Sequence, residues 1–157
     1  MTGPVVLTWT AACLISYILG SINAAYYWIR WVYGTDIRNA GSGNAGARNA
    51  GRVHGKASFM AVLIMDAALG ALAVVIGIMA SSMDSLLPGF CALMAIVGHV
   101  FPAQLHGKGG KGLAKATGGL IMLAVSGATA SLWLAVPGSL VLLAFTHRSY
   151  IRHSRRK

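Results

Sequence analysis

Long apolar stretches alternate with short basic segments along the whole chain. Residues 4–29, 57–107 and 116–147 contain no Lys or Arg, and Asp66 and Asp84 are their only acidic residues. Each stretch is long enough to cross a bilayer, since a membrane-spanning helix needs roughly 20 apolar residues. The pattern therefore predicts an all-α polytopic membrane protein.

The number of crossings depends on how each stretch divides. The first stretch predicts one helix, and the second predicts two, at about 57–80 and 88–105, joined by a short outer turn at 81–85. The third stretch fits one long helix or two short crossings. Two crossings require a break, and the candidates are residues 126–131 and the pair Pro137 and Gly138.

The basic residues predict the orientation of the chain. All thirteen fall in three groups, at 30–56, 108–115 and 148–157. Short loops rich in Lys and Arg stay on the cytoplasmic side of a membrane. We therefore expect a single domain over residues 1–157 with five crossings, the N-terminus outside and the C-terminus in the cytoplasm. No basic residue precedes the first apolar stretch, so we expect it to be a retained span rather than a cleaved signal.

Composition and charge limit the classes of molecule that the protein is expected to bind. The chain is 56% hydrophobic, and its formal net charge is +10. In a soluble protein this charge would indicate nucleic acid, but a lipid-embedded chain has little surface left for a duplex. We expect the lipid bilayer and phosphorylated molecules as partners, and no nucleic acid. Cys13 and Cys91 lie within apolar stretches, and they indicate neither a disulfide framework nor the CxxC spacing of a metal site.

The first basic loop has the composition of a phosphate-binding segment. Residues 41–52 read GSGNAGARNAGR, and their four glycines are expected to free the backbone so that several N–H groups face one anion. Alternatively, the segment is a flexible basic loop that only touches lipid headgroups. The side chains expected to bind phosphate are Arg38, Ser42, Asn44, Arg48, Asn49 and Arg52.

The second basic loop follows the helix predicted to end near residue 105. Lys108 and Lys111 stand among glycines just before an apolar helix, so two ammonium groups, backbone amides and a helix N-terminus can converge on one anion. His99 bonds a loop carbonyl or acts as an acid or base, and for a lone histidine the first role is favoured. Two such loops on one face suit a reaction between a soluble phosphate and a lipid-tailed phosphate.

Asp66 belongs to a stripe of small residues on its predicted helix. It is followed at helical spacing by Gly70, Ala73, Gly77 and Ala80, which indicates a face that packs closely against another helix. A carboxylate within a bilayer is costly and normally faces a partner or a water-filled cavity. Structural and functional roles for Asp66 remain open at this point.

Three strings resemble one enzyme family. GSGNAGARNAGR after DIR, then GHVFP and KGGKG, are similar to motifs of the bacterial acyl-phosphate:glycerol-3-phosphate acyltransferases over about residues 15–120. The resemblance implies acyl transfer from acyl phosphate to the 1-hydroxyl of glycerol 3-phosphate at the cytoplasmic face of the cell membrane, giving lysophosphatidic acid and phosphate without a cofactor. It assigns Ser42, Gly43, Asn44, Asn49 and Arg52 to the first substrate loop, and His99, Lys108, Gly109, Gly110 and Lys111 to the second.

The reaction of this family requires few catalytic groups from the protein. An acyl phosphate already carries a good leaving group, so binding its phosphate and placing the hydroxyl supply much of the acceleration. Ser42 and His99 are the candidate catalytic residues. The hydroxyl proton goes to an oxygen of the acyl phosphate or to His99, and we favour the former because no sequence feature ties His99 to an orienting carboxylate.

The chain departs from the family pattern at several positions. The family usually has Thr at the position of Arg48 and Ala or Thr at the position of Lys115. It usually has Lys at the position of Leu69, so Asp66 lacks the basic neighbour that the family has on the same helix. A third family motif, which helps to bind glycerol 3-phosphate, is matched only by residues 147–150. Those residues equally resemble a helix end that precedes further segments in longer relatives, and part of the acceptor site would then be absent.

These departures leave alternatives to an active enzyme. One is an inactive relative that binds phospholipid or acyl phosphate as a partner subunit. Another is a small membrane transporter subunit, which an acid on a small-residue face would suit.

Overall fold

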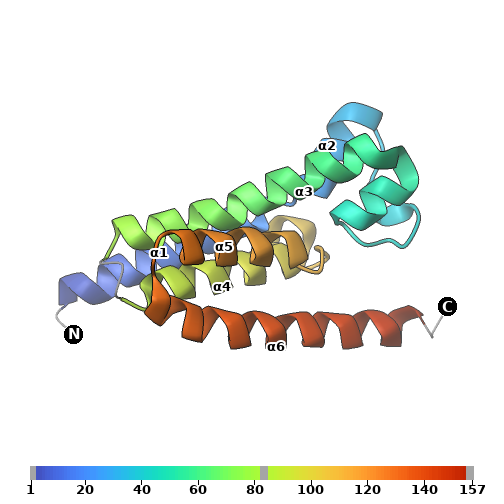
Figure 1. Ribbon diagram of the computed structural model, residues 1–157. Coiled ribbons are helices and arrows are strands. Elements are labelled where there is room, and N and C mark those ends of the chain that lie inside the picture. The colour runs from blue at the N-terminus through green and yellow to red at the C-terminus, as the bar shows by residue number, and fades with distance from the viewer. Residues whose placement is uncertain (1–2, 82–84, 155–157) are drawn as a thin grey trace.

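The computed structural model describes residues 3–81 and 85–154, and the described part of the chain is helical (Figure 1). Residues 82–84 of the predicted outer turn lie outside this part. The elements are α1 Gly3–Ser21, α2 Ala24–Tyr33, a 3-10 turn Ile37–Asn39, α3 Ala47–Met79, α4 Leu87–Val100, a second 3-10 turn Ala103–Leu105, α5 Leu113–Val125 and α6 Thr129–Ser154.

Four segments are long and apolar enough to cross a membrane. They are Gly3–Tyr33, Ala47–Met79, Leu87–Leu105 and Thr129–His147, and α5 is a shorter apolar helix. The predicted all-helical membrane architecture is confirmed. The 13 residues of α5 extend only about 20 Å at 1.5 Å per residue, which is less than the roughly 30 Å of a hydrocarbon core.

The first apolar stretch was predicted to form one continuous helix, and this prediction is wrong because the stretch forms two helices. It breaks between α1 and α2 at Asn23, whose side-chain oxygen accepts a hydrogen bond of 2.9 Å from the Tyr26 N–H and so caps α2. The Asn23 Nδ2 atom donates to the Ala45 carbonyl at 3.1 Å. A buried asparagine therefore joins this break to the loop before α3.

The third apolar stretch divides at one of its two candidate breaks. Helix α5 ends at Val125 and α6 begins at Thr129, with Gly127 at a φ of 72° between them. Pro137, the other candidate, lies inside α6. The prediction of two helices here is confirmed, and the break lies near residue 127.

Helix α3 begins at Ala47 rather than near residue 57, so about half of the glycine-rich segment is helical. Gly55 interrupts the helix with a φ of 83°, a conformation that favours glycine. In Figure 1 the start of α3 turns back toward the main part of the helix at this kink. Asn49 and Arg52 consequently sit on a short helical segment and not in a flexible loop.

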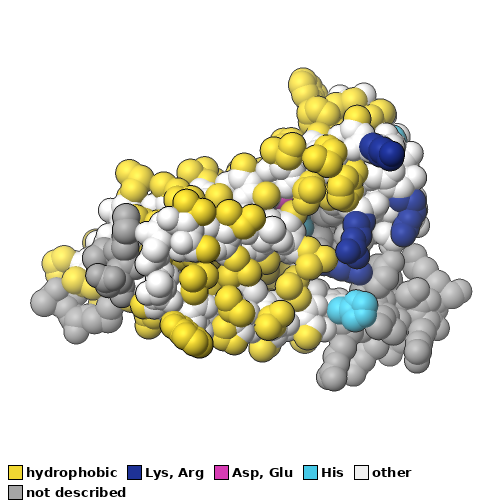
Figure 2. Space-filling view, viewed as in Figure 1, with side chains coloured by type: hydrophobic (Ala, Val, Ile, Leu, Met, Phe, Trp, Pro, Cys, Tyr) yellow, Lys and Arg dark blue, Asp and Glu magenta, His cyan; other side chains and the backbone are white. Residues whose placement is uncertain are grey.

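Small residues bring the helices together, as the stripe at Asp66 predicted. A Cβ atom at Gly70 would collide with the backbone of Lys115 on α5, and one at Gly77 would lie 2.6 Å from the Pro88 Cα atom on α4. Helix α3 therefore approaches both neighbours at backbone distance. Figure 2 shows that Lys and Arg side chains gather at one end of the molecule, which in Figure 1 carries the loop before α3.

Candidate functional site

The two predicted loops meet around a cavity of about 480 Å³. Residues from the first loop, from the ends of α4 and α5 and from the middle of α3 form its walls. Its lining comprises Ser42, Asn44, Gly46, Ala47, Arg48, Asn49, Arg52, Phe59, Leu63, Asp66, His99, Lys111, Gly112, Leu113, Ala114 and Thr117.

Two helix N-termini open into this cavity. Helix α3 starts after Gly46 and α5 after Gly112, and neither start is capped by a side chain or carries an acid in its first turn. The first N–H groups of a helix lack intrahelical acceptors, and the helix dipole favours an anion beside them. With Arg48, Arg52 and Lys111 on the same walls, the cavity is suited to bind phosphate groups.

Asn49 holds the first loop in shape. Its buried Nδ2 atom donates to the carbonyls of Ile37 and Ala40 at 3.1 and 2.9 Å, and its Oδ1 atom accepts from the Ser42 N–H at 2.8 Å. Gly41 and Gly43 turn the chain here with positive φ values of 59° and 71°. The Asn49 amide thus places Ser42 at the cavity, and of the four glycines expected to free this segment only these two adopt the left-handed conformation.

The glycines of the second loop allow it to lie against His99. The N–H groups of Gly109 and Gly110 donate to the carbonyls of Val100 and His99 at 3.3 and 3.1 Å. A Cβ atom at Gly110 would collide with His99 Nε2 and with the Ala45 carbonyl. Gly110 therefore packs between the imidazole and the first loop.

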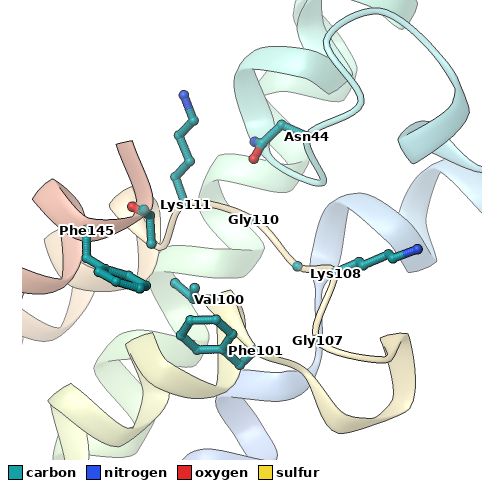
Figure 3. A pocket seen from close by; sticks show the side chains of 10 residues that line it. Asn44, Val100, Phe101, Gly107, Lys108, Gly110, Lys111 and Phe145 are labelled. Carbon is teal, nitrogen blue, oxygen red and sulfur yellow. The ribbon is translucent and has the colours of Figure 1, made fainter. Parts of the chain in front are cut away.

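A second cavity of about 190 Å³ lies beside the first and shares Asn44 and Lys111 with it. Val100, Phe101 and Phe145 form an apolar part of its wall, and Thr146 lines it from α6 (Figure 3). In Figure 3 the Lys108 side chain extends away from these rings, while Lys111 rises on the side of Asn44. Polar and apolar groups thus meet where the two cavities adjoin.

A buried cluster of charged and polar groups lies below the larger cavity. Asp66 on α3 and Lys115 on α5 form an ion pair, with 2.9 Å between Oδ1 and Nζ. His99 Nδ1 lies 3.6 Å from the same Oδ1 atom and, within the described residues, donates to no loop carbonyl. A carboxylate therefore faces His99, although no sequence feature indicated one. The hydrogen bond from His99 to a loop carbonyl, which the sequence favoured, is not present at Nδ1 in the part of the chain that the structure describes.

The remaining predicted residues lie apart from the larger cavity. Arg38 binds Asp36 through two nitrogens, at 2.7 Å for the shortest contact, and its guanidinium covers the Tyr26 ring. These contacts hold the pKa of the Asp36 carboxyl below its ordinary value, chiefly through the Arg38 hydrogen bond. Gly43, Lys108 and His147 are exposed, and neither Gly43 nor His147 lines either cavity.

Sequence reasoning missed two contributions to the site. Lys115 was singled out only as a departure from the family pattern, although a lysine at the start of an apolar helix indicates a buried partner. Thr117, Phe59 and Leu63 line the larger cavity without a motif to mark them. Among the described residues, no group of three or more His, Cys, Asp or Glu side chains is placed to hold a metal ion.

Comparison with known proteins identifies the family. The model of the glycerol-3-phosphate acyltransferase family matches residues 10–153. The chain belongs to this family. It is 45% identical to glycerol-3-phosphate acyltransferase 1 of a Bacillus cereus strain over 106 residues, which is 68% of this chain and 56% of that protein. It is 39% identical to the Myxococcus xanthus enzyme over 122 residues, 78% of this chain and 64% of the relative.

A solved structure extends the family likeness to the fold. PlsY (YgiH), an integral membrane glycerol 3-phosphate acyltransferase crystallised in its glycerol 3-phosphate form, is 26% identical, with a TM-score of 0.78. The match covers 94% of this chain and 92% of that one. By sequence the chain spans little more than half of the Bacillus cereus family member.

Proposed function

We propose that the chain transfers an acyl group from acyl phosphate to the 1-hydroxyl of glycerol 3-phosphate, giving lysophosphatidic acid and phosphate. One observation carries this proposal: two helix N-termini, Ser42, His99 and three cationic side chains line one cavity at the basic end of a membrane protein of this family. A site for two phosphorylated substrates needs this density of anion-binding groups beside an apolar surface.

The proposed reaction is a direct displacement. The 1-hydroxyl oxygen forms a bond to the acyl carbon, the bond from that carbon to the phosphate oxygen breaks, and phosphate leaves with the electron pair. Arg48, Arg52 and Lys111 are the residues that neutralise phosphate charge, and Ser42 donates a hydrogen bond to substrate. Neither a metal nor coenzyme A takes part.

The hydroxyl proton has two possible acceptors, an oxygen of the acyl phosphate and the His99 ring. Without an orienting carboxylate the phosphate would be favoured, but Asp66 Oδ1 lies 3.6 Å from His99 Nδ1. We therefore propose that His99 Nε2 accepts the hydrogen bond of the 1-hydroxyl. The proton then reaches His99 or the departing phosphate as the new ester bond forms.

Leu69, which stands where the family usually has Lys, does not indicate that the protein is inactive. Leu69 leaves Asp66 without a basic neighbour on its own helix, yet Lys115 supplies an ammonium group from α5 at 2.9 Å. Arg48 adds a cation to the larger cavity. Asp66 therefore keeps a cationic partner, which comes from another helix, and the larger cavity gains one further cation for phosphate.

The membrane arrangement is part of the proposal. We infer that the basic end faces the cytoplasm, that α5 forms a short fifth crossing, and that the N-terminus lies outside. Single cysteines in the C-terminal tail, on a background without Cys13 and Cys91, test this by labelling of intact cells. A tail that reacts with an impermeant reagent from outside would refute the orientation.

One assay tests the activity. Purified protein receives acyl phosphate and labelled glycerol 3-phosphate, and lysophosphatidic acid is expected as the product. A reaction with acyl coenzyme A in place of acyl phosphate is the control and is expected to yield none. Folded protein that makes no product from acyl phosphate would refute the proposed function and leave a binding role.

A further inference from the structure

Lys115 is a charged side chain inside the helical bundle, with none of its surface exposed. An ammonium group in such a place is costly unless partners replace its water. The structure supplies two, because Nζ lies 2.9 Å from Asp66 Oδ1 and donates to the Ile22 carbonyl at 3.1 Å. Lys115 therefore ties α5 to α3 and to the end of α1.

The Asp66 carboxylate connects this lysine to the cavity. Its Oδ1 atom also accepts from the Ala24 N–H at 3.4 Å and lies 3.6 Å from His99 Nδ1. His99 Nδ1 is buried and has no hydrogen-bond partner within the described chain. The gap is a few tenths of an ångström beyond a good hydrogen bond, so a small movement of the ring closes it.

The opposite side of the His99 ring is also confined. Gly110 lies against Nε2, where a Cβ atom would collide, and the Gly110 N–H donates to the His99 carbonyl at 3.1 Å. Both Asp66 and His99 line the larger cavity. The imidazole is thus held between a carboxylate on one side and the substrate loop on the other.

We propose that Lys115 is a positioning residue that holds the Asp66 carboxylate against His99 Nδ1. With its proton on Nδ1 and bound to Asp66, the neutral ring has an unprotonated Nε2 on the side of Gly110. The kinetic consequence rests on the proposed acyl transfer. The tautomer of His99 does not depend on that reaction, so a failure of the positioning proposal can be told from a failure of the proposed acyl transfer.

Two variants separate positioning from mere stability. Lys115→Met leaves the Asp66 charge buried without its cation, so a lower Tm and a lower kcat are expected. Asp66→Leu with Lys115→Met removes both charges, so Tm is expected to recover. If the pair positions His99, kcat stays at least about tenfold low, while KM for glycerol 3-phosphate changes less than about threefold. Recovery of kcat together with Tm would overturn the proposal.

A cycle with His99 tests the route of the effect. His99→Ala is expected to lower kcat in the native background and to have little further effect in the double variant, because the two changes act through the same ring. Effects that simply multiply would show that the pair acts elsewhere. Lys56→Met, which removes an exposed cation lining neither cavity, is the matched control and should leave kcat unchanged.

A spectroscopic measurement on the native protein needs no activity. Nitrogen-15 NMR of the native protein in detergent, with His99 assigned by its absence in His99→Ala, reports which ring nitrogen carries the proton. We expect a protonated Nδ1 and an unprotonated Nε2 near neutral pH. The opposite tautomer would overturn the proposal whatever the kinetics show.

Discussion

Lys115 Nζ and Asp66 Oδ1 lie 2.9 Å apart although their residues are 49 positions apart in the chain. The pair joins the first turn of α5 to the middle of α3, below the cavity that the two glycine-rich loops enclose. In an apolar bundle the two charges depend on each other, since either one alone would be buried without compensation. Because the two residues lie on different helices, the role of the pair can be tested by placing the ammonium group on α3 instead of α5.

Moving the ammonium group to α3 should restore what Lys115→Met removes. Leu69 stands three residues after Asp66 on the same helix, and side chains at this spacing are neighbours. We expect Leu69→Lys combined with Lys115→Met to regain Tm and kcat relative to Lys115→Met alone, measured by thermal unfolding and the acyl-transfer assay. Leu69→Met with Lys115→Met is the control, and equal values for the two combinations would contradict the prediction.

Lys111 should matter for substrate binding because it lines both cavities. Losing a charge-assisted hydrogen bond to phosphate costs about 1.5–3 kcal/mol, so Lys111→Ala is expected to lower kcat/KM by roughly 10- to 150-fold. Steady-state kinetics with each substrate varied in turn measures this. Lys56→Ala serves as the control, and if both variants keep full activity the phosphate site has been misplaced.

Asn49→Ala should disorder the loop that carries Ser42. The change removes three hydrogen bonds from a buried amide, so we expect a loss of about 1–3 kcal/mol in the free energy of unfolding and a fall in kcat/KM. Asn39→Ala, at an exposed position in the preceding turn, is the matched control. Stability should be compared by denaturant unfolding, and an effect on Asn39→Ala as large as on Asn49→Ala would argue against this role.

Gly110→Ala should disturb the contact between the second loop and His99. The added methyl group would collide with the imidazole and with the Ala45 carbonyl, which costs about 1–3 kcal/mol in a packed region. We expect activity to fall more steeply than Tm, because the displaced ring faces the cavity. Gly3→Ala introduces the same methyl group into open space, and it should change neither measurement.

Arg38 should stabilise the fold in a pH-dependent way. Its hydrogen bonds lower the pKa of Asp36 from the ordinary 3.8, so the folded state binds the proton less readily than the unfolded state. The stabilisation is complete above that ordinary value and is lost as pH falls through the lower folded pKa. Arg38→Ala should therefore reduce the unfolding free energy at neutral pH, with a difference that shrinks in acid. A constant difference across this range would show another origin.

Much of the fold follows from the apolar pattern alone. Membrane-length apolar stretches must form helices because lipid offers no partners for backbone N–H and C=O groups, so the spans could be predicted. For the third stretch the sequence offered two candidate breaks, and the one near Gly127 is the one that the structure shows. The two loops could be predicted as a candidate phosphate site because glycine, amide and cationic residues are clustered locally. Each of these inferences uses residues that are close together in the sequence.

Tertiary structure decided what depends on residues far apart. Asn23 caps α2 by accepting from the Tyr26 N–H, and its amide also donates to the distant Ala45 carbonyl. Helical periodicity does not indicate that second contact. Asp66 likewise meets its cation on α5 rather than on its own helix, and His99 comes within 3.6 Å of the same carboxylate. The sequence alone determined which residues could carry charge into the membrane. Helix packing determined which of them would meet, because a buried charge is stabilised only by the groups that the fold brings beside it.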